Sequence, residues 1–282
     1  MSTKGPNFSE TEFEGERGTE IFYRAWKPTG ASKAAVVITH GQGDHGGRHQ
    51  RSAEHFVGKG FAVYAADLRG HGKSDGRRGH VDNFDDYLAD TSRVIEMARH
   101  ENPQLKTFLF GHSLGGLIVL DYAEKMGGHI SGVIVTSPLL RLKMEVPSWK
   151  VALGKMLSSV APTMSMKTGL DPNLLSHDGE VVRNYISDPL VHGVASTRFY
   201  TELIRATNET LHGGRRLTLP CLVMIGTGDG IVDSSATKEF FGTIASSDKT
   251  LKTYEGLYHE VLNEPERDSL LSEISSWISA RI

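Results

Sequence analysis

The chain has 282 residues, 38% of them hydrophobic and 23% charged, which is the composition of an ordinary globular protein. This length accommodates one large α/β domain with room for an insertion. The net charge of −3, together with the lack of a basic run interleaved with aromatic residues, argues against a nucleic acid partner.

The N-terminal stretch MSTKGPNFSE lacks the apolar core of a signal peptide, and no apolar stretch reaches transmembrane length. We therefore expect a cytosolic protein, with peripheral contact to a membrane left open. The single cysteine, Cys221, excludes an intrachain disulfide, and its apolar neighbours predict a buried structural thiol.

Six apolar segments predict the strands of a sheet. The stretch 13–28 (FEGERGTEIFYRAWKP) predicts an antiparallel pair at a sheet edge. The runs that follow are too continuously apolar for half-exposed strands, so they predict parallel strands covered on both faces. Their ranges are 34–39, 61–66, 107–111, 132–136 and 221–226.

Helix-length segments alternate with these strands, which predicts a wound α/β sheet. Between residues 83 and 102 the apolar side chains fall mostly on one face of a helix: Phe84, Leu88, Val94, Ile95 and Ala98. The C-terminal stretch has the same spacing and should close one face of the sheet through Leu270, Leu271, Ile274, Trp277 and Ile278.

The region 138–216 interrupts this alternation, because it has no clear buried strand. It predicts a helical cap inserted into a core formed by residues 1–137 and 217–282. Four of the eight methionines lie in it: Met144, Met156, Met164 and Met166. Flexible thioether side chains suit an acyl tunnel, and they equally suit the interior of a cap.

The stretch GHSLG (111–115) matches the G-x-S-x-G pattern, with a predicted strand before it and a predicted helix after it. Such a corner is too sharp for side chains at the flanking positions, which explains Gly111 and Gly115. It exposes the Ser113 hydroxyl in front of the positive end of a helix dipole. We therefore predict that Ser113 is a nucleophile.

A serine nucleophile needs a base and a group that orients the base, in the chain order serine, acid, histidine in this context. Asp229 follows the strand 221–226, and His259 follows the next predicted strand. We prefer Asp229 to Asp233, which lies further from the strand end. The remaining downstream histidines fall in loops or in the insertion and predict solvated or locally bonded side chains: His129, His177, His192 and His212.

A tetrahedral intermediate also requires two hydrogen bond donors directed at its oxyanion. The main-chain amide of Leu114 can provide one donor. The second should come from the glycine-rich loop after the first buried strand, THGQGDHGGRH, where the amide of Gln42 is our candidate.

The same loop contains GQGDHG, a literal dinucleotide-binding pattern, and Asp67 follows about 20 residues later. His40 stands where an apolar residue is usual, and the following segment opens with polar residues, so we expect no dinucleotide. DLRGHGKS has Asp67 where a P-loop needs its first glycine. Glycines separate His40, His45 and His49, and no acidic partner follows them, so we expect neither a metal nor an organic cofactor.

Taken together, these motifs make the chain similar to the monoacylglycerol lipases and, more broadly, to the lysophospholipase-like serine hydrolases of the α/β-hydrolase fold. The resemblance covers nearly the whole chain. It rests on HGQGDHGGR, DLRGHGKSDG, GHSLGG, NYISDPL, GTGDGIVD, DKTLKTYEGLYHEV and the C-terminal helix.

The resemblance implies the triad Ser113, Asp229 and His259, an oxyanion hole formed by the amides of Gln42 and Leu114, and a cap over the site. It further implies a glycerol head group site at Asp44, Arg48, His112 and Tyr185. Two positions depart from the pattern: many relatives carry glutamate where Asp44 stands, and some carry a second histidine where Leu262 stands. The residues themselves leave two other interpretations open, an Asp44–Arg48 surface pair and a packing role for Tyr185.

The implied activity is hydrolysis of the ester of a monoacylglycerol or a similar single-chain lipid, with the apolar cap surface contacting a membrane or micelle. The alternatives are a lysophospholipase or general carboxylesterase that uses the same residues, and a non-catalytic binding protein of the same fold. The complete set of three triad residues argues against the last of these.

Overall fold

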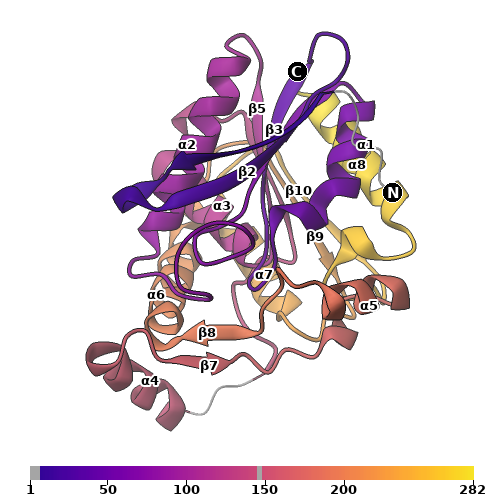
Figure 1. The fold of residues 1–282 in the computed structure, drawn as a ribbon. Coiled ribbons are helices and arrows are strands. Elements are labelled where there is room, and N and C mark those ends of the chain that lie inside the picture. Colours follow the sequence, from indigo (N-terminus) through magenta and orange to yellow (C-terminus); the bar gives the residue numbers. More distant parts are fainter. Residues whose placement is uncertain (1–6, 145–147) are drawn as a thin grey trace.

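The computed structural model describes residues 7–144 and 148–282 and shows one eight-stranded sheet with helices on both faces (Figure 1). The strand order is β1-β2-β4-β3-β5-β6-β9-β10, parallel from β4 to β10, with β1 and β2 antiparallel at one edge. The strands are β1 (Phe8–Glu14), β2 (Glu20–Trp26), β3 (Ala34–Thr39), β4 (Phe61–Ala66), β5 (Thr107–His112), β6 (Gly132–Thr136), β9 (Cys221–Gly226) and β10 (Lys249–Tyr254). The predicted edge hairpin and all five predicted buried strands are confirmed.

Two hydrophobic clusters hold the helices against the sheet because successive strand residues point to opposite faces. In β3, Ala35 and Val37 belong to the cluster under α2, α3 and α7, whereas Val36 and Ile38 belong to the cluster under α1 and α8. The helices are α1 (Gln50–Gly58), α2 (Asp85–Glu101), α3 (Leu114–Met126), α7 (Ser234–Thr243) and α8 (Arg267–Ser279). The apolar positions predicted for α2 and α8 are all buried, as is Cys221.

Between β6 and β9 the chain leaves the sheet and forms α4 (Ser148–Val160), β7 (Ser165–Lys167), α5 (Gly179–Ser187), β8 (Val194–Ser196) and α6 (Thr197–Gly213). The insertion is therefore not purely helical, because β7 and β8 pair as a small antiparallel sheet. These two strands could not be predicted from the sequence, because a strand of three residues is too short to show an apolar periodicity. All three residues of β7 are also exposed.

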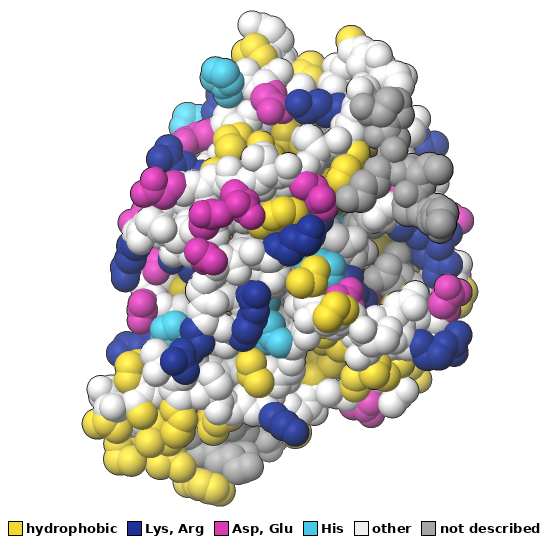
Figure 2. Space-filling view, in the orientation of Figure 1, with side chains coloured by type: hydrophobic (Ala, Val, Ile, Leu, Met, Phe, Trp, Pro, Cys, Tyr) yellow, Lys and Arg dark blue, Asp and Glu magenta, His cyan; other side chains and the backbone are white. Residues whose placement is uncertain are grey.

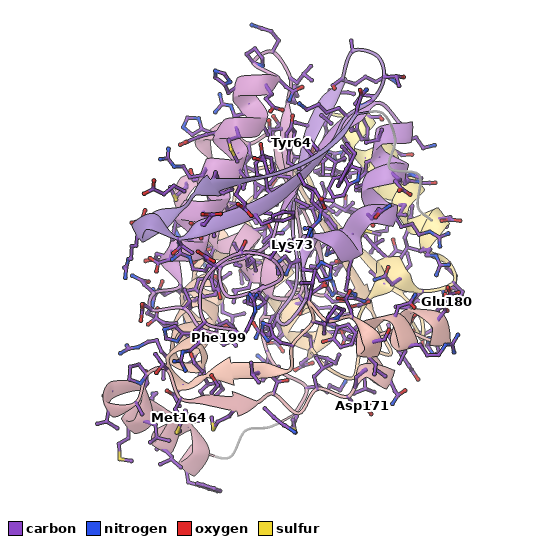
Figure 3. The ribbon with its side chains drawn as sticks, viewed as in Figure 1. Tyr64, Lys73, Met164, Asp171, Glu180 and Phe199 are labelled. Carbon is purple, nitrogen blue, oxygen red and sulfur yellow. The ribbon has the colours of Figure 1, made fainter. Side chains whose placement is uncertain are left out.

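The insertion extends across one end of the molecule: Figure 3 places Met164 at one extremity and Asp171 and Glu180 at the other. Its four methionines are 39% to 66% exposed, so the interpretation that they form the interior of the insertion is wrong. None of the helices in the described ranges 7–144 and 148–282 combines the length and hydropathy needed to span a bilayer.

Candidate active site

Ser113 occupies the turn between β5 and α3 in a strained backbone conformation, with φ 54° and ψ −116°. The residues two positions before and after Ser113 must be glycines. A Cβ on Gly111 would overlap the backbone of Gly115, and a Cβ on Gly115 would overlap the carbonyl of Thr39. The strain is held by hydrogen bonds on both sides, because Ser113 N donates to Thr136 O at 3.0 Å and Ser113 O accepts from Leu139 N at 3.0 Å. The corner therefore presents the hydroxyl at the N-terminus of α3.

Asp229 and His259 lie together at the same edge of the sheet, after β9 and β10. His259 Nδ1 lies 2.8 Å from Asp229 Oδ2, and both side chains are almost fully buried. Asp229 Oδ1 accepts from the amides of Ile231 and Val232 at 2.8 and 2.9 Å. Burial opposes ionisation of Asp229, but His259 and the two amides hold its pKa below the ordinary value. The pair leaves His259 Nε2 as the nitrogen that can accept a proton.

The loop after β10 that carries His259, here called the histidine loop (residues 255–260), lies beside the turn at Ser113 through two contacts. The rings of His112 and His259 lie 4.9 Å apart, and Ser137 Oγ donates to the carbonyl of His259 at 2.8 Å. Within the described ranges, Ser113 Oγ makes no hydrogen bond. A bond from a nucleophile to its base often tightens only when substrate binds, so the lack of this bond does not argue against Ser113 as a nucleophile.

The two main-chain N–H groups predicted for the oxyanion hole are both available as hydrogen bond donors. In the part of the chain that the structure describes, neither Gln42 N nor Leu114 N donates to a main-chain carbonyl. Gly41 packs against the serine corner, since a Cβ on it would lie 3.3 Å from Ser113 Cβ. The loop after β3 therefore lies beside the nucleophile, as an oxyanion hole requires.

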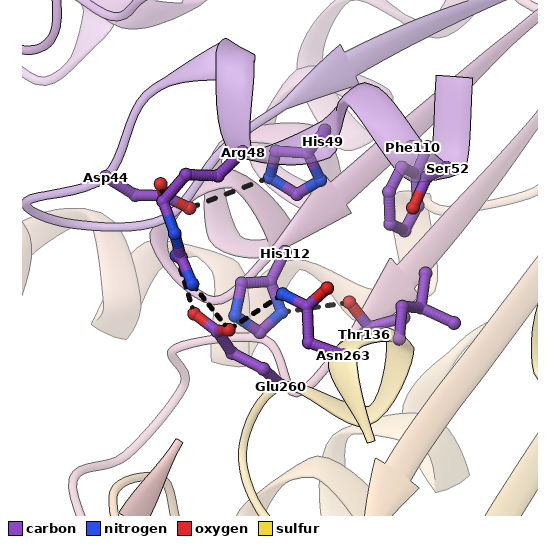
Figure 4. Close-up of a pocket in the computed structure, with 10 residues that line it drawn as sticks. Asp44, Arg48, His49, Ser52, Phe110, His112, Thr136, Glu260 and Asn263 are labelled. Carbon is purple, nitrogen blue, oxygen red and sulfur yellow. Dashed lines mark hydrogen bonds and ion pairs between the residues drawn. The ribbon is translucent and has the colours of Figure 1, made fainter. Parts of the chain in front are cut away.

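Three of the residues predicted for the head group, Asp44, Arg48 and His112, meet in a buried polar cluster (Figure 4). Arg48 forms a bidentate ion pair with Glu260, with both Nη to Oε distances 2.8 Å, and its Nη1 lies 3.2 Å from Asp44 Oδ1. Tyr185 of α5 lies against Arg48, whose Cζ is 4.8 Å from the ring centroid. The pairing of Asp44 with Arg48 is thus confirmed, but its predicted surface location is wrong because both side chains are buried or nearly so.

Glu260 is the residue that sequence reasoning missed, although its place directly after His259 was a signal. Burial opposes its ionisation, yet Arg48 keeps the pKa of Glu260 below its usual value. Likewise, Arg48 outweighs burial and holds the pKa of Asp44 well below its usual value. Asp44 and Glu260 thus place two negative charges against the one positive charge of Arg48, and His49 Nε2 lies 3.7 Å from Asp44 Oδ2.

A cavity of about 20 Å³ lies beside this cluster, which is room for about one water molecule. Its lining includes the polar residues His49, His112 and Asn263 together with apolar Phe110 and Leu262. His112 Nδ1 lies 3.0 Å from Thr136 Oγ1, and burial lowers the pKa of His112 to about 3, so its imidazole is neutral.

The residues that suggested other functions have structural partners. Asp67 pairs with Arg24 and accepts from the amides of Gly46 and Lys73. His40 Nε2 accepts from Leu68 N, and burial lowers its pKa to about 4. Asp233 caps α7 through the amide of Ser235 and contacts Arg141 at 3.2 Å, away from His259.

This fold and this strand-edge constellation define a hydrolase of the α/β-hydrolase class, and comparison with known proteins is consistent with it. The chain belongs to the family described as serine aminopeptidase S33, whose model matches residues 30–266. It is 34% identical to a monoacylglycerol lipase of Mycolicibacterium smegmatis, over 97% of this chain and 98% of the relative. It is 35% identical to the monoglyceride lipase of Homo sapiens, over 94% of this chain and 88% of the relative.

A solved structure supports the same assignment. The crystal structure of Paleococcus ferrophilus monoacylglycerol lipase superposes with a TM-score of 0.86 at 35% identity, covering 93% of this chain and 99% of that one. The resemblance predicted from the motifs and the predicted fold class are confirmed.

Proposed function

We propose that the protein is a serine carboxylic ester hydrolase that cleaves monoacylglycerols to fatty acid and glycerol. The observation that carries this proposal is the Asp229–His259 pair at the strand edge where Ser113 is held at a helix N-terminus. The lipases named above, which match nearly the whole chain, support the choice of substrate class.

In the proposed mechanism, Ser113 Oγ attacks the ester carbonyl while His259 Nε2 takes its proton. Asp229 keeps the proton on His259 Nδ1 and stabilises the imidazolium. The amides of Gln42 and Leu114 stabilise the oxyanion. His259 then protonates the departing glycerol oxygen, the acyl group stays on Ser113, and a water activated by His259 releases the fatty acid and restores the serine.

We place the glycerol head group beside the cluster formed by Asp44, Arg48, His112 and Tyr185. Glycerol is neutral and rich in hydroxyl groups, and the cluster offers it charged and neutral hydrogen bond partners. The negative balance of Asp44, Arg48 and Glu260 disfavours an anionic head group. Burial, with Asp44 next in effect, raises the pKa of Tyr185 to about 12, so its hydroxyl stays a donor.

The insertion at 138–216 acts as the cap in this proposal, and its outer surface contacts the lipid aggregate that holds the substrate. On α4 the exposed apolar residues follow helical spacing along one stripe: Trp149, Leu153, Met156 and Val160. Figure 2 shows hydrophobic side chains gathered at this end of the molecule. A contiguous exposed apolar surface of this kind marks a site of interaction.

The decisive test is hydrolysis of 1-monooleoylglycerol by the wild type and by Ser113→Ala, together with labelling by a fluorophosphonate probe. We expect labelling and turnover in the wild type, and a loss of at least about 10³-fold with no labelling in the variant. Labelling that persists in Ser113→Ala would remove Ser113 as the nucleophile.

A substrate series separates monoacylglycerol from the alternatives named above. We expect kcat/KM on 1-monooleoylglycerol to exceed that on lysophosphatidylcholine and on lysophosphatidylglycerol of the same acyl chain. A preference for either lysophospholipid would replace the proposed substrate and leave the serine mechanism in place. Comparable rates on all three and on p-nitrophenyl butyrate would indicate a general carboxylesterase.

A further inference from the structure

The loop that supplies one oxyanion amide is bonded at three points to the insertion. Gln42 Nε2 donates to the carbonyl of Val194 at 3.0 Å, and Gly43 O accepts from His192 N at 3.0 Å. His45 Nε2 lies 3.0 Å from Asp188 Oδ2. As the loop runs from 42 to 45 its partners run from 194 back to 188, so the two segments lie antiparallel.

The close approach of the two segments is built into the sequence at Gly43. This residue has φ +73°, and a Cβ on it would overlap the carbonyl of His192. The pairing of loop and insertion therefore requires a residue without a side chain. Asp188 is itself held, because its Oδ1 accepts from Leu190 N at 2.9 Å.

The amide group of Gln42 is held through its nitrogen, because burial keeps the pKa of His71 well below its usual value and the one ring proton of His71 bonds to the carbonyl of Arg69. Gln42 Nε2 bonds to Val194 in β8, and its Oε1 lies 3.1 Å from His71 Nε2. The His71 ring in turn packs against His192, with 4.7 Å between the ring centroids. The Gln42 side chain thus bonds the loop after β3 to the insertion and lies beside the loop after β4.

We propose that the Gln42 side chain is a positioning residue that fixes the direction of its own main-chain N–H in the oxyanion hole. The side chain and the N–H share one Cα, so a side chain held at its far end restricts the backbone rotation that would turn the N–H away. Oxyanion donors act through preorganisation, and small misalignments weaken them strongly. The inference rests on the proposed function, since it takes the Gln42 amide as a donor.

A purely structural role for Gln42 predicts a different result. If the side chain only fastened the insertion to the core, its loss would lower stability and alter substrate binding, and would leave the chemical step intact. A positioning role lowers kcat and leaves KM nearly unchanged, because the oxyanion forms only in the transition state.

The test is Gln42→Met, which keeps the size of the side chain and removes its hydrogen bonds. Activity is measured on p-nitrophenyl butyrate, an ester without a glycerol head group, so the result does not depend on the head group site. We expect kcat to fall about tenfold with KM within twofold, since losing a donor outright costs roughly 10²- to 10³-fold. The control is Gln104→Met, the same exchange at an exposed position, with unchanged kcat.

A second variant, Asp188→Ala, tests the same pairing from the insertion and keeps the test informative if Gln42→Met folds poorly. We expect kcat to fall about threefold. In both variants, inhibition by an alkylboronic acid, which forms a tetrahedral adduct with the serine, should weaken in parallel with kcat.

Unchanged kcat in both folded variants, or a change confined to KM, would overturn the positioning role. The wild type and Ser113→Ala on the same ester keep the two proposals apart. Serine-dependent turnover that survives Gln42→Met intact sinks the positioning role alone, whereas turnover that survives Ser113→Ala sinks the proposed function.

Discussion

The insertion contains two parts that differ in their hydrogen bonds to the loops of the proposed active site. We call residues 171–194, which include α5, the inner segment, and residues 148–167, which include α4 and β7, the outer segment. The inner segment bonds to both loops of the site: Glu260 N donates to Leu175 O at 2.8 Å, and Gln42 bonds to Val194. The outer segment bonds mainly to α6, for example through Ser158 Oγ and Thr201 Oγ1 at 2.9 Å, and pairs with β8 through β7.

The two parts also differ in which side chains they bury and which they expose. The inner segment buries Tyr185 against Arg48 and directs polar groups at the core, whereas the outer segment exposes Trp149 at 63% and Met156 at 58%. The inner segment is therefore bonded to the loops of the proposed site, whereas the outer segment presents an apolar surface to solvent. The comparison indicates that substitutions in the inner segment should affect chemistry, and substitutions in the outer segment should affect access to lipid.

The largest effect is expected where the inner segment meets the histidine loop. Glu264 is fully buried and accepts from the amides of His177 and Tyr258, at 2.9 and 2.6 Å, and from Ser176 Oγ at 3.2 Å. Glu264→Ala leaves these donors unpaired, so we expect the free energy of unfolding to fall by about 3 kcal/mol. Because the same bonds position His259, kcat should fall at least about tenfold. Urea unfolding and kinetics on p-nitrophenyl butyrate measure the two effects.

The matched control is Glu266→Ala, two residues away and exposed, which should change neither quantity. If Glu264→Ala lost stability but kept kcat, the inner segment would be a structural support without influence on His259.

A smaller effect is expected from the outer segment, and only on aggregated substrate. Replacing Trp149, Met156 and Val160 together by serine removes apolar surface at about 25 cal/mol per Å², so association with phosphatidylcholine vesicles should weaken about tenfold. Flotation measures the association, and kcat on soluble p-nitrophenyl butyrate should not change. Serine at Met126 and Ile282, also exposed but elsewhere, should leave flotation as in the wild type. Equal flotation of all three proteins would contradict a lipid-binding role for α4.

The smallest effect concerns a contact between the core and the turn that follows α6 at the end of the insertion. Glu124 of α3 is buried, and its Oε2 lies 3.1 Å from Nη2 of Arg216. Burial raises the pKa of Glu124 from 4.5 to about 8. Between these values the unfolded chain has released a proton that the folded chain retains, so stability falls as pH rises through this window. Glu124→Gln removes this pH dependence. The Tm of the variant minus the Tm of the wild type should therefore increase by about 3 °C between pH 5 and pH 9.

Thermal unfolding across that pH range measures this prediction. Glu96→Gln, on an exposed site of α2, should give a Tm curve parallel to that of the wild type. A parallel curve for Glu124→Gln as well would show that Glu124 ionises normally in the folded protein.

Much of the framework could be predicted from the sequence because its causes are local. Continuous apolar runs determine buried strands, and the glycines on either side of Ser113 are required by a turn only a few residues long. The order of Ser113, Asp229 and His259 along the chain, each at the end of a strand, places them at one edge because parallel strands end together.

Other features were decided by tertiary structure. Arg48 and Glu260 are 212 residues apart, and only the meeting of two loops turns them into a bidentate pair. The bond from Gln42 to Val194 joins residues 152 apart, and its acceptor is a main-chain carbonyl, which carries no residue type to recognise. The strands β7 and β8 are three residues long and acquire their partners only when the insertion folds. Sequence alone therefore determined which groups stand at the strand ends, and the packing of the insertion determined what holds them in place.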